Sequence, residues 1–441
     1  MCLFAAVTFA SHFLFPSVRW FFRKRADRLV ARLNTRLKRP IEPFKLARRM
    51  NTINRLTHDP QVAQAILDHA RTEGIPENVA FETARRYAGE IVPGFSATLY
   101  FSVAMRLARW LSQSLYRVRV TGEERAFEGV DPDATVIFVL NHRSNMDYVL
   151  VTWLAARQTA LAYAVGEWAR RWPLAPLIRA LGGYFVRRRD LNPLYRKILA
   201  RYVQLATDNG VTQAVFPEGR LSRDGALHSP KLGILSYILE DFDPDRDRNV
   251  VFVPVAMNYD RVLEDRVLIA AETSGPRAFR LRWYTVVRYL VLHLQLRLTR
   301  RFTRFGIAAV AFGRPLSLAD MAFSAEADPT AALGEELMLR IAEVLPVLPM
   351  ALICDALCKG ATTIDAVVQH VEMRAETLRS TDHPVHAPKA GLRHAVVGAL
   401  SMLQGRKLLR VSEMKVHIPD EARPILRFYA RTLPRYKSVK L

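Results

Sequence analysis

Residues 134–147 read Ala-Thr-Val-Ile-Phe-Val-Leu-Asn-His-Arg-Ser-Asn-Met-Asp, a β-branched, apolar run that passes directly into polar residues. The run predicts a buried strand, and a strand that ends in a polar turn brings side chains to the rim of a sheet, where α/β proteins place their sites. His142 and Asp147 lie five residues apart across this turn. A histidine that exchanges a proton needs a carboxylate on its other ring nitrogen to fix the tautomer. The pair alone is equally compatible with a structural hydrogen bond that caps a helix.

The surrounding sequence predicts strands that alternate with helices. Further short apolar runs occur at 211–216, 250–255 and 307–312, and longer helical patterns at 194–207 and 229–239 lie between some of them. This alternation is typical of an α/β domain with a mostly parallel sheet flanked by helices.

Helical patterns also precede this domain. Asp59-Pro60 is an N-cap followed by a first-turn proline, so it predicts a helix that ends near Gly74. Two further helices are expected over 76–87 and 96–114. These segments predict an N-terminal helical subdomain.

The end of the chain is expected to be mainly helical, with a break at Leu345-Pro346 and Leu348-Pro349. A hairpin near 408–418 follows a helix, which resembles a winged-helix module. We therefore divide the chain into a basic leader (1–39), a helical subdomain (40–114), the α/β domain (115–319) and a C-terminal helical module (320–441).

The net charge predicts an anionic partner. The 441 residues include 64 Lys and Arg against 42 Asp and Glu, a formal charge of +22. Such an excess favours nucleic acid, an anionic membrane surface or phosphorylated substrates. Cys2, Cys354 and Cys358 make no disulfide framework, and the last two are spaced as helix neighbours in an apolar run. Buried thiols in a reducing cytosol fit them better than metal ligands.

Two segments suggest attachment to a membrane. Residues 1–22 are apolar and aromatic but interrupted, and a basic cluster at 23–39 follows them. This pattern favours an anchor whose flank meets anionic cytoplasmic headgroups. Residues 277–304 carry eight arginines and no acidic residue around an apolar body. Such a segment could lie on a membrane or pack on the sheet as a structural helix.

Two more segments carry groups suited to a phosphorylated ligand. Residues 181–188 read Leu-Gly-Gly-Tyr-Phe-Val-Arg-Arg, where glycines permit close approach and Arg187 and Arg188 could hold a phosphate. Residues 216–225 read Phe-Pro-Glu-Gly-Arg-Leu-Ser-Arg-Asp-Gly. This turn places the carboxylate of Glu218, which could bind a hydroxyl, beside two arginines.

In their order and spacing, these segments resemble the glycerolipid acyltransferase superfamily, whose hallmark is a His-x4-Asp pair followed by a Pro-Glu-Gly-type motif. The segments Pro230-Lys231-Leu232-Gly233, Tyr259–Glu264 and Phe312–Leu316 are similar to the branch that acylates glycerol 3-phosphate. That branch includes dihydroxyacetone-phosphate acyltransferases. The resemblance runs from about residue 40 to the end. The family has an arginine where Leu221 stands, and here the neighbouring Arg220 is the arginine.

The resemblance implies a role for each motif. His142 would be the general base on the sn-1 hydroxyl, and Asp147 would orient it. The residues expected to bind glycerol 3-phosphate are Arg187, Glu218, Gly219, Arg220, Arg223 and Lys231. The residues expected to line the acyl path, after a strand that ends near 255, are Val253, Pro254 and Val255. Because a thioester is already activated, a positioned base and proximity suffice, with no metal or other cofactor.

The expected function is transfer of a fatty acyl group from acyl-CoA or acyl carrier protein to glycerol 3-phosphate. The expected location is the cytoplasmic face of a bacterial inner membrane, with peripheral or anchored attachment to anionic phospholipid. The enzymatic alternative is acylation of a lysophospholipid. Nucleic-acid binding is less favoured because no base-reading motif accompanies the charge. An inactive lipid-binding relative is the remaining alternative, and Leu221 is its only support.

Overall fold

The computed structural model describes residues 28–156, 158–166, 170, 174–187, 191–273, 295, 304–321, 328–388 and 390–434. Arg188, most of the 1–39 leader and nearly all of the 277–304 segment therefore lie outside the described residues, together with the predictions made for them. None of the helices in the described ranges is long and apolar enough to cross a membrane.

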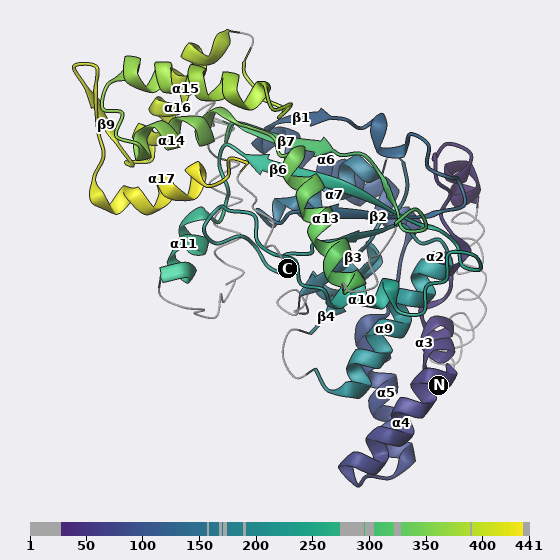
Figure 1. The fold of residues 1–441 in the computed structure, drawn as a ribbon. Coiled ribbons are helices and arrows are strands. Elements are labelled where there is room, and N and C mark those ends of the chain that lie inside the picture. The colour runs from purple at the N-terminus through teal and green to yellow at the C-terminus, as the bar shows by residue number, and fades with distance from the viewer. Residues whose placement is uncertain are drawn as a thin grey trace, which may run out of the picture.

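A mixed, mostly parallel sheet forms the centre of the molecule (Figure 1). Its main path runs β1-β7-β6-β2-β5-β3-β4, and β8 pairs with β6 beside β7. Strands β7 and β8 are antiparallel to β6, and β1 is parallel to β7, so β1, β7 and β8 run opposite to the other strands. The strands are β1 (Arg117–Thr121), β2 (Thr135–Leu140), β3 (Ala162–Gly166), β4 (Gly183–Val186), β5 (Gln213–Val215), β6 (Val250–Tyr259), β7 (Ile307–Phe312) and β8 (Leu316–Ser317). The sheet confirms the predicted α/β class.

Strand β2 lies inside this sheet and is buried throughout. It pairs in parallel with both β5 and β6. Ile137 and Val139 belong to the core on one face of the sheet, whereas Val136, Phe138 and Leu140 belong to the core on the other. A strand that is covered on both faces has apolar residues at nearly every position. This burial explains the continuous apolar run of β2 before the polar turn.

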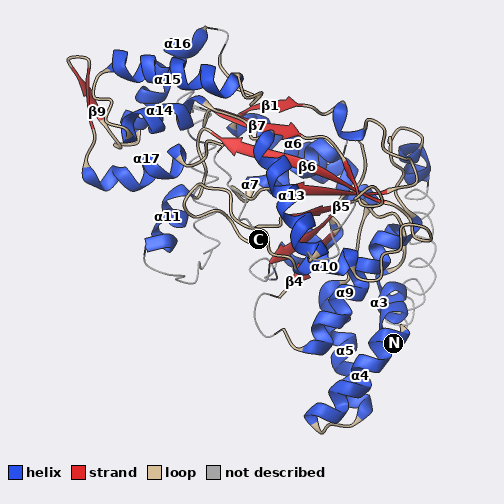
Figure 2. Ribbon diagram, in the orientation of Figure 1, coloured by secondary structure: helices blue, strands red, loops and turns tan. Residues whose placement is uncertain are grey.

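Helices cover both faces of the sheet (Figure 2). The N-terminal helices pack with α9, α10 and α13 on one face, and α7 and α8 cover the other. The helices and helical turns up to α13 are α2 (Pro43–Leu46), α3 (Arg49–Thr57), α4 (Pro60–Glu73), α5 (Glu77–Ile91), the π-helical turn Leu99–Ala104, α6 (Met105–Leu115), the 3-10 turn Arg125–Phe127, α7 (Met146–Ala155), α8 (Leu174–Ala180), α9 (Pro193–Asp208), α10 (Gly233–Leu239), α11 (Asp265–Thr273) and α13 (Pro329–Glu343).

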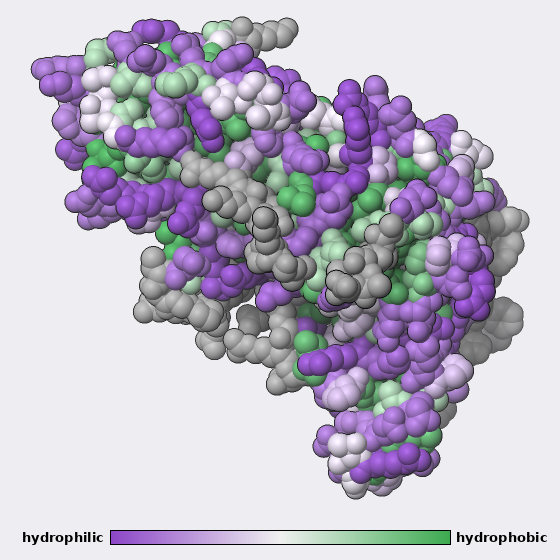
Figure 3. All heavy atoms as spheres, viewed as in Figure 1, coloured by the Kyte–Doolittle hydropathy of each residue, from purple (hydrophilic) through white to green (hydrophobic). Residues whose placement is uncertain are grey.

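The predicted limits of α4 are confirmed by its caps. The Asp59 side chain accepts a hydrogen bond from the backbone N–H of Gln61, and Gly74 ends the helix in the left-handed region at φ 63°. The helix buries Val62, Ile66 and Ala70 at a spacing of four residues. Figure 3 shows hydrophilic residues over most of the visible face of these N-terminal helices. One apolar stripe per helix therefore holds the subdomain on the sheet.

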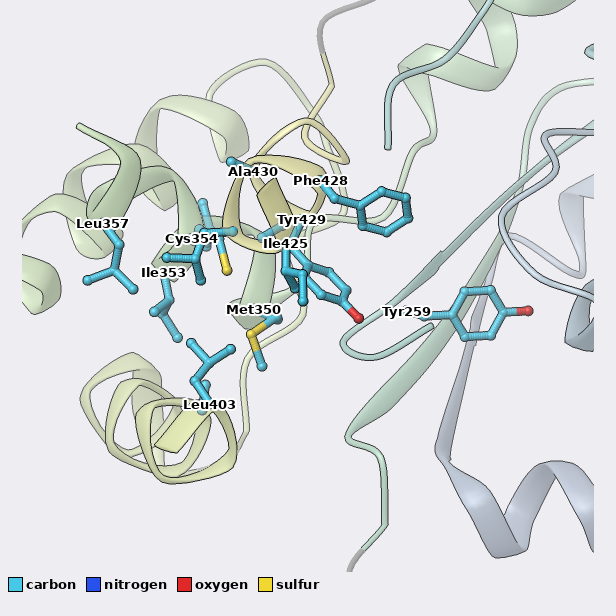
Figure 4. Packing of buried hydrophobic residues seen from close by; sticks show 14 of the residues in the cluster. Tyr259, Met350, Ile353, Cys354, Leu357, Leu403, Ile425, Phe428, Tyr429 and Ala430 are labelled. Carbon is cyan, nitrogen blue, oxygen red and sulfur yellow. The ribbon is translucent and has the colours of Figure 1, made fainter. Parts of the chain in front are cut away.

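A second helical core follows α13, and it contains the predicted hairpin. Its elements are α14 (Pro349–Cys358), α15 (Ile364–Arg379), α16 (Gly391–Gly405), β9 (Arg410–Ser412), β10 (Lys415–His417), the 3-10 turn Asp420–Ala422 and α17 (Arg423–Ala430). A bridge from Thr363 to Lys415 joins the segment before α15 to the hairpin, as in a winged helix. Figure 4 shows Met350, Cys354, Leu403 and Tyr429 packed together in this core.

Three features differ from the sequence prediction. Strand β6 does not end near 255 but continues to Tyr259, and β3 and β4 were not predicted as strands. Helix α13 packs on β6 and α10, so the separate helical core begins at α14. We use the name C-terminal module below for α14–α17 with the β9–β10 hairpin.

Candidate active site

The polar turn after β2 is pinned to the neighbouring strand by one side chain. Asn141 accepts a hydrogen bond at Oδ1 from the backbone N–H of Met257 (2.7 Å) and donates from Nδ2 to its carbonyl (2.9 Å). These two bonds continue the β2–β6 pairing beyond the last β2 residue. The turn that carries His142 therefore starts from a fixed point at the sheet rim.

His142 and Asp147 are joined, as the sequence predicted. Nδ1 of His142 lies 2.9 Å from Oδ2 of Asp147, and the two residues are only 4% and 0% exposed. Helix α7 begins at Met146, so the carboxylate lies in its first turn. Since Nδ1 carries the proton toward the carboxylate, Nε2 is the nitrogen that accepts one. Within the described ranges, Nε2 has no hydrogen-bond partner.

Four donors fix the carboxylate of Asp147. Besides the ring of His142, Oδ2 accepts the backbone N–H groups of Arg143 (2.7 Å) and Ser144 (3.0 Å). Oδ1 accepts the hydroxyl of Tyr259 at 2.6 Å. Burial and the adjacent Asp147 carboxylate raise the pKa of Tyr259 well above its usual value, so the phenol keeps its proton and donates. The carboxylate is therefore held in one orientation by both the turn and the end of β6.

Glu264 holds the other half of the turn. Its Oε2 accepts the Ser144 hydroxyl (2.8 Å), and its Oε1 accepts the backbone N–H (3.0 Å) and side-chain amide (2.8 Å) of Asn145. Sequence reasoning identified Tyr259–Glu264 only as a segment that resembles the glycerol 3-phosphate branch, and it gave these residues no role. It missed the polar functions of Tyr259 and Glu264, for which the polar and charged residues that follow the apolar run at 250–255 were the available signal.

Aromatic rings enclose the imidazole. The ring centroid of Phe216 lies 4.3 Å from that of His142, and Tyr148 approaches it edge-on at 5.3 Å. Both rings limit the rotation of the imidazole and exclude water from its faces. The base is therefore oriented by a carboxylate at one nitrogen and by aromatic packing on its faces.

Glu218 is buried against the backbone. Oε1 accepts the N–H of His142 (2.9 Å), Oε2 accepts the N–H of His228 (3.2 Å), and the residue is 2% exposed. Burial raises the pKa of this carboxyl group. The structure thus places Glu218 as a tie between the His142 turn and the loop over 216–231. Its predicted contact with glycerol 3-phosphate stays a prediction.

A backbone hydrogen bond closes the 216–231 loop at its base. Arg143 joins the loop to the His142 turn. The backbone N–H of Lys231 donates to the carbonyl of Pro217 (2.7 Å), and a Cβ on Gly219, which has φ 66°, would lie 3.0 Å from the Lys231 side chain. The buried guanidinium of Arg143 donates to the carbonyls of Gly225 and Ala226. Sequence reasoning did not single out Arg143, although its position between His142 and Asp147 was a signal.

The predicted phosphate-binding residues fall into two groups. Arg220 and Lys231 are exposed and Arg223 is half-buried, all on the 216–231 loop. Leu221, between two of them, packs against the core of the C-terminal module. No described group ion-pairs with these three cations. They are therefore available to an anion.

Arg187 has a protein partner. Its guanidinium donates from Nε (2.9 Å) and Nη2 (2.8 Å) to the two carboxylate oxygens of Glu90 on α5, which raises the pKa of Arg187. It also lies over the rings of Tyr87 and Tyr195. Arg170 approaches the same carboxylate at 3.1 Å. A phosphate at Arg187 must therefore replace or join Glu90.

The residues predicted to line an acyl path are part of the sheet core. Val253, Pro254 and Val255 lie within β6, buried and paired with residues 138–140 of β2. Val253 and Val255 contribute to the core beneath α7. Their contact with an acyl chain stays a prediction. In the described ranges, no group of three or more His, Cys, Asp or Glu side chains could hold a metal ion.

Comparisons with known proteins assign both halves of this arrangement. Residues 117–258, which hold the His142 turn and the 216–231 loop, match the family model described as Acyltransferase. Residues 294–430 match the model described as Glycerol-3-phosphate acyltransferase C-terminal region. Over these two stretches the chain is similar to acyltransferases.

The similar curated proteins share one name. Glycerol-3-phosphate acyltransferase from Pseudomonas entomophila is 32% identical over 278 residues, which cover 62% of this chain and 32% of that relative. The enzyme of the same name from Aeromonas hydrophila is 31% identical, over 62% of this chain and 33% of its own length. The match thus spans about a third of these relatives. Over the matched residues, the chain is similar to proteins named glycerol-3-phosphate acyltransferase.

One solved structure is also similar. The 1-acyl-sn-glycerophosphate (LPA) acyltransferase from Thermotoga maritima is 24% identical, and the match covers 54% of this chain and 76% of that one at a TM-score of 0.33.

Proposed function

We propose that this protein transfers a fatty acyl group from acyl-CoA or acyl carrier protein to the sn-1 hydroxyl of glycerol 3-phosphate. The main support is the 2.9 Å bond between His142 and Asp147 inside the region that matches the acyltransferase family. The names of the curated relatives support the acceptor. A base fixed in this way suits abstraction of a hydroxyl proton.

The reaction then follows from the geometry of the base. The acceptor hydroxyl gives its proton to Nε2 of His142 as its oxygen attacks the thioester carbonyl carbon. The carbon–sulfur bond breaks, the sulfur leaves as a thiolate, and the imidazolium returns the proton to it. Asp147 stabilises the imidazolium between these steps. General-base catalysis of this kind contributes roughly 10²–10⁴-fold, and proximity of the two bound substrates supplies much of the remainder.

The phosphate of the acceptor is assigned to the cations of the 216–231 loop. Arg220, Arg223 and Lys231 lie on the loop that Glu218 ties to the His142 turn. Arg187 joins them if the phosphate displaces Glu90. Charge-assisted bonds to phosphate are about twice as strong as neutral ones, so a few such cations fix the acceptor beside the base.

The acyl donor or the product partitions into a membrane, and the charge of the chain fits that location. The formal charge of +22 favours an anionic surface, to which each basic residue near the bilayer contributes about 1 kcal/mol. We place the protein at the cytoplasmic face of a bacterial inner membrane. The 1–39 leader and the 277–304 segment are the proposed contacts.

The test is a product assay with purified protein. Radiolabelled glycerol 3-phosphate is incubated with acyl-CoA or with acyl carrier protein charged with the same acyl chain, and the lipids are separated by number of chains. The expected product is singly acylated glycerol 3-phosphate, and His142→Ala should abolish it while the far-UV circular dichroism is unchanged. If the protein acylates only added lysophosphatidic acid, or if the alanine variant turns over normally, the proposal is wrong.

A further inference from the structure

A second histidine–aspartate pair lies in the loop that borders the active site. Nε2 of His228 is 2.9 Å from Oδ1 of Asp224, and Oδ2 of Asp224 accepts a hydrogen bond from Nη1 of Arg431 at 2.9 Å. Arg431 directly follows α17. A charged chain of three side chains therefore runs from the C-terminal module to the site loop.

Asp224 is fixed independently of His228. Its Oδ1 also accepts the backbone N–H of Ala226 at 3.1 Å. The bond to this anchored carboxylate raises the pKa of the His228 imidazole; burial lowers it, the Glu218 carboxylate raises it, and Arg220 lowers it. These are the charged groups that face the ring, together with Arg431 behind Asp224. The bond to Asp224 therefore stabilises the imidazolium form of His228 relative to that of a free histidine.

His228 lies next to the catalytic turn. Its backbone N–H donates to Oε2 of Glu218, and the backbone N–H of His142 donates to Oε1 of the same carboxylate. The two histidines are thus attached to opposite oxygens of one buried side chain. The His142 side chain is 5% exposed, whereas that of His228 is 36% exposed and can meet a ligand.

The Nδ1 edge of the His228 ring is suited to binding an anion. Nε2 of His228 is engaged with Asp224, and among the described residues Nδ1 has no partner, so in the imidazolium it is an N–H donor open to solvent. Arg220 and Lys231 are on the same loop, whereas Leu221 turns into the apolar core. The His228 imidazolium therefore adds a positive charge to a loop in which Leu221 supplies none.

We infer that His228 is a specificity-determining residue that binds the phosphate of the acceptor through Nδ1, held in place by the chain from Arg431 through Asp224. This inference rests on the proposed function. A phosphate monoester has its second pKa near ~6. Binding is therefore strongest where both the dianion and the imidazolium exist, and it weakens as pH rises through the folded pKa of His228.

The experiment measures the KM for glycerol 3-phosphate at pH 6.5 and 8.5 in wild type, His228→Gln, His228→Lys and Asp224→Asn. Glutamine at 228 keeps the backbone N–H that serves Glu218, so the loop stays tied. At pH 6.5 we expect His228→Gln to raise this KM by about fivefold or more, with kcat and the acyl-donor KM nearly unchanged. His417→Gln, in the exposed face of β10, is the matched control and should change nothing.

The pH dependence separates a cation from a structural side chain. Wild type should lose affinity for the acceptor between pH 6.5 and 8.5, His228→Lys should lose much less, and Asp224→Asn should already be weak at pH 6.5. Wild-type activity on glycerol 3-phosphate establishes the proposed function separately. If that activity is present and His228→Gln keeps a normal KM, or if the loss falls on kcat and lysine does not restore the affinity, the inference is overturned.

Discussion

Asp147 and Glu218 are both buried carboxylates of the site, but their partners differ. Asp147 accepts a hydrogen bond from the ring of His142, whereas among the described residues Glu218 accepts hydrogen bonds from the backbone N–H groups of His142 and His228 alone. The sequence identified both residues because their types and spacing match a family pattern. It could not identify the partners of Glu218, because a backbone amide leaves no signal in the side-chain sequence.

The ion pair between Arg187 and Glu90 leads to a prediction for acceptor binding. If Arg187 contacts the phosphate, Glu90 competes for the same guanidinium. Glu90→Gln should then lower the KM for glycerol 3-phosphate by about three- to tenfold, since a neutral amide is a weaker partner than a carboxylate. Initial rates at varied acceptor concentration measure this effect.

A matched control lies on the same helix. Glu82 is an exposed residue of α5 that pairs only at the surface, with Arg85, so Glu82→Gln should leave the KM unchanged. A higher KM in Glu90→Gln would instead mean that Glu90 positions Arg187. An unchanged KM would mean that Arg187 does not meet the phosphate in the rate-determining complex.

At the scale of elements, Asp260 joins three segments. It follows β6, and its carboxylate accepts the N–H of Ile307 at the start of β7 (2.8 Å) and of Met350 at the start of α14 (3.2 Å). Burial raises its pKa from 3.8 to about 6. The folded state therefore binds the proton more tightly than the unfolded state does.

The sign of the pH effect follows directly. The stabilisation from this group is fully present below about pH 4 and is lost as pH rises to about 6, a change on the order of 3 kcal/mol. Asp260→Asn should remove this slope from urea unfolding measured between pH 4 and 7. The exposed Asp245→Asn should keep it. Parallel pH profiles in wild type and Asp260→Asn would contradict the assignment.

Gly225 tests the contact between the site loop and α17. It has φ 86°, and an added Cβ would collide with the backbone carbonyl of Phe428. Gly225→Ala should therefore displace the loop from α17 and cost kcat as well as stability. Gly360→Ala is the control, since Gly360 also has a positive φ, 93°, but open space around it. It should cost only the backbone strain, about 1–2 kcal/mol, and keep normal turnover.

The sequence predicted elements with strong local signals. The caps of α4, the break before α14 and the strand β2 each depend on neighbouring residues. The end of β6 was not predicted correctly, because a proline such as Pro254 is rarely found inside a strand. Here the outer edge of β6 pairs with β8 at 251–252 and with β7 at 255–259, so Pro254 lies where the partner changes and its missing N–H is tolerated. Only the tertiary pairing reveals this.

At the scale of the whole molecule, the C-terminal module is bonded to the strand ends that carry the site. Asn258 of β6 donates to the carbonyls of Pro346 (2.9 Å) and Thr432 (3.3 Å), which lie just before and just after the module. Asp265, at the start of α11, accepts Arg406 (2.5 Å) and the hydroxyl of Tyr429 (2.6 Å). All these bonds are buried or nearly so, which favours cooperative unfolding of module and sheet together.

The Arg406–Asp265 pair gives a test of this coupling. Arg406→Met leaves the Asp265 carboxylate buried without its cation and should lower the free energy of unfolding by about 3–5 kcal/mol. Urea unfolding followed by far-UV circular dichroism should still show one transition. The double variant with Asp265→Asn should recover part of the loss. A second transition, or no loss of stability, would mean that the module folds independently of the sheet.

The bond between Asp224 and Arg431 joins residues 207 positions apart in the chain. When residue 233 has just left the ribosome, the His142 turn and the 216–231 loop are outside it. Helix α17 and Arg431, which contact this loop in the folded protein, have not yet been made. Contacts of such separation form late in folding, because a long segment must be ordered before they close. The nascent protein therefore carries His142, Asp147 and His228 long before α17 can hold the loop in place, and a chain interrupted during synthesis before α17 would expose this loop to proteases.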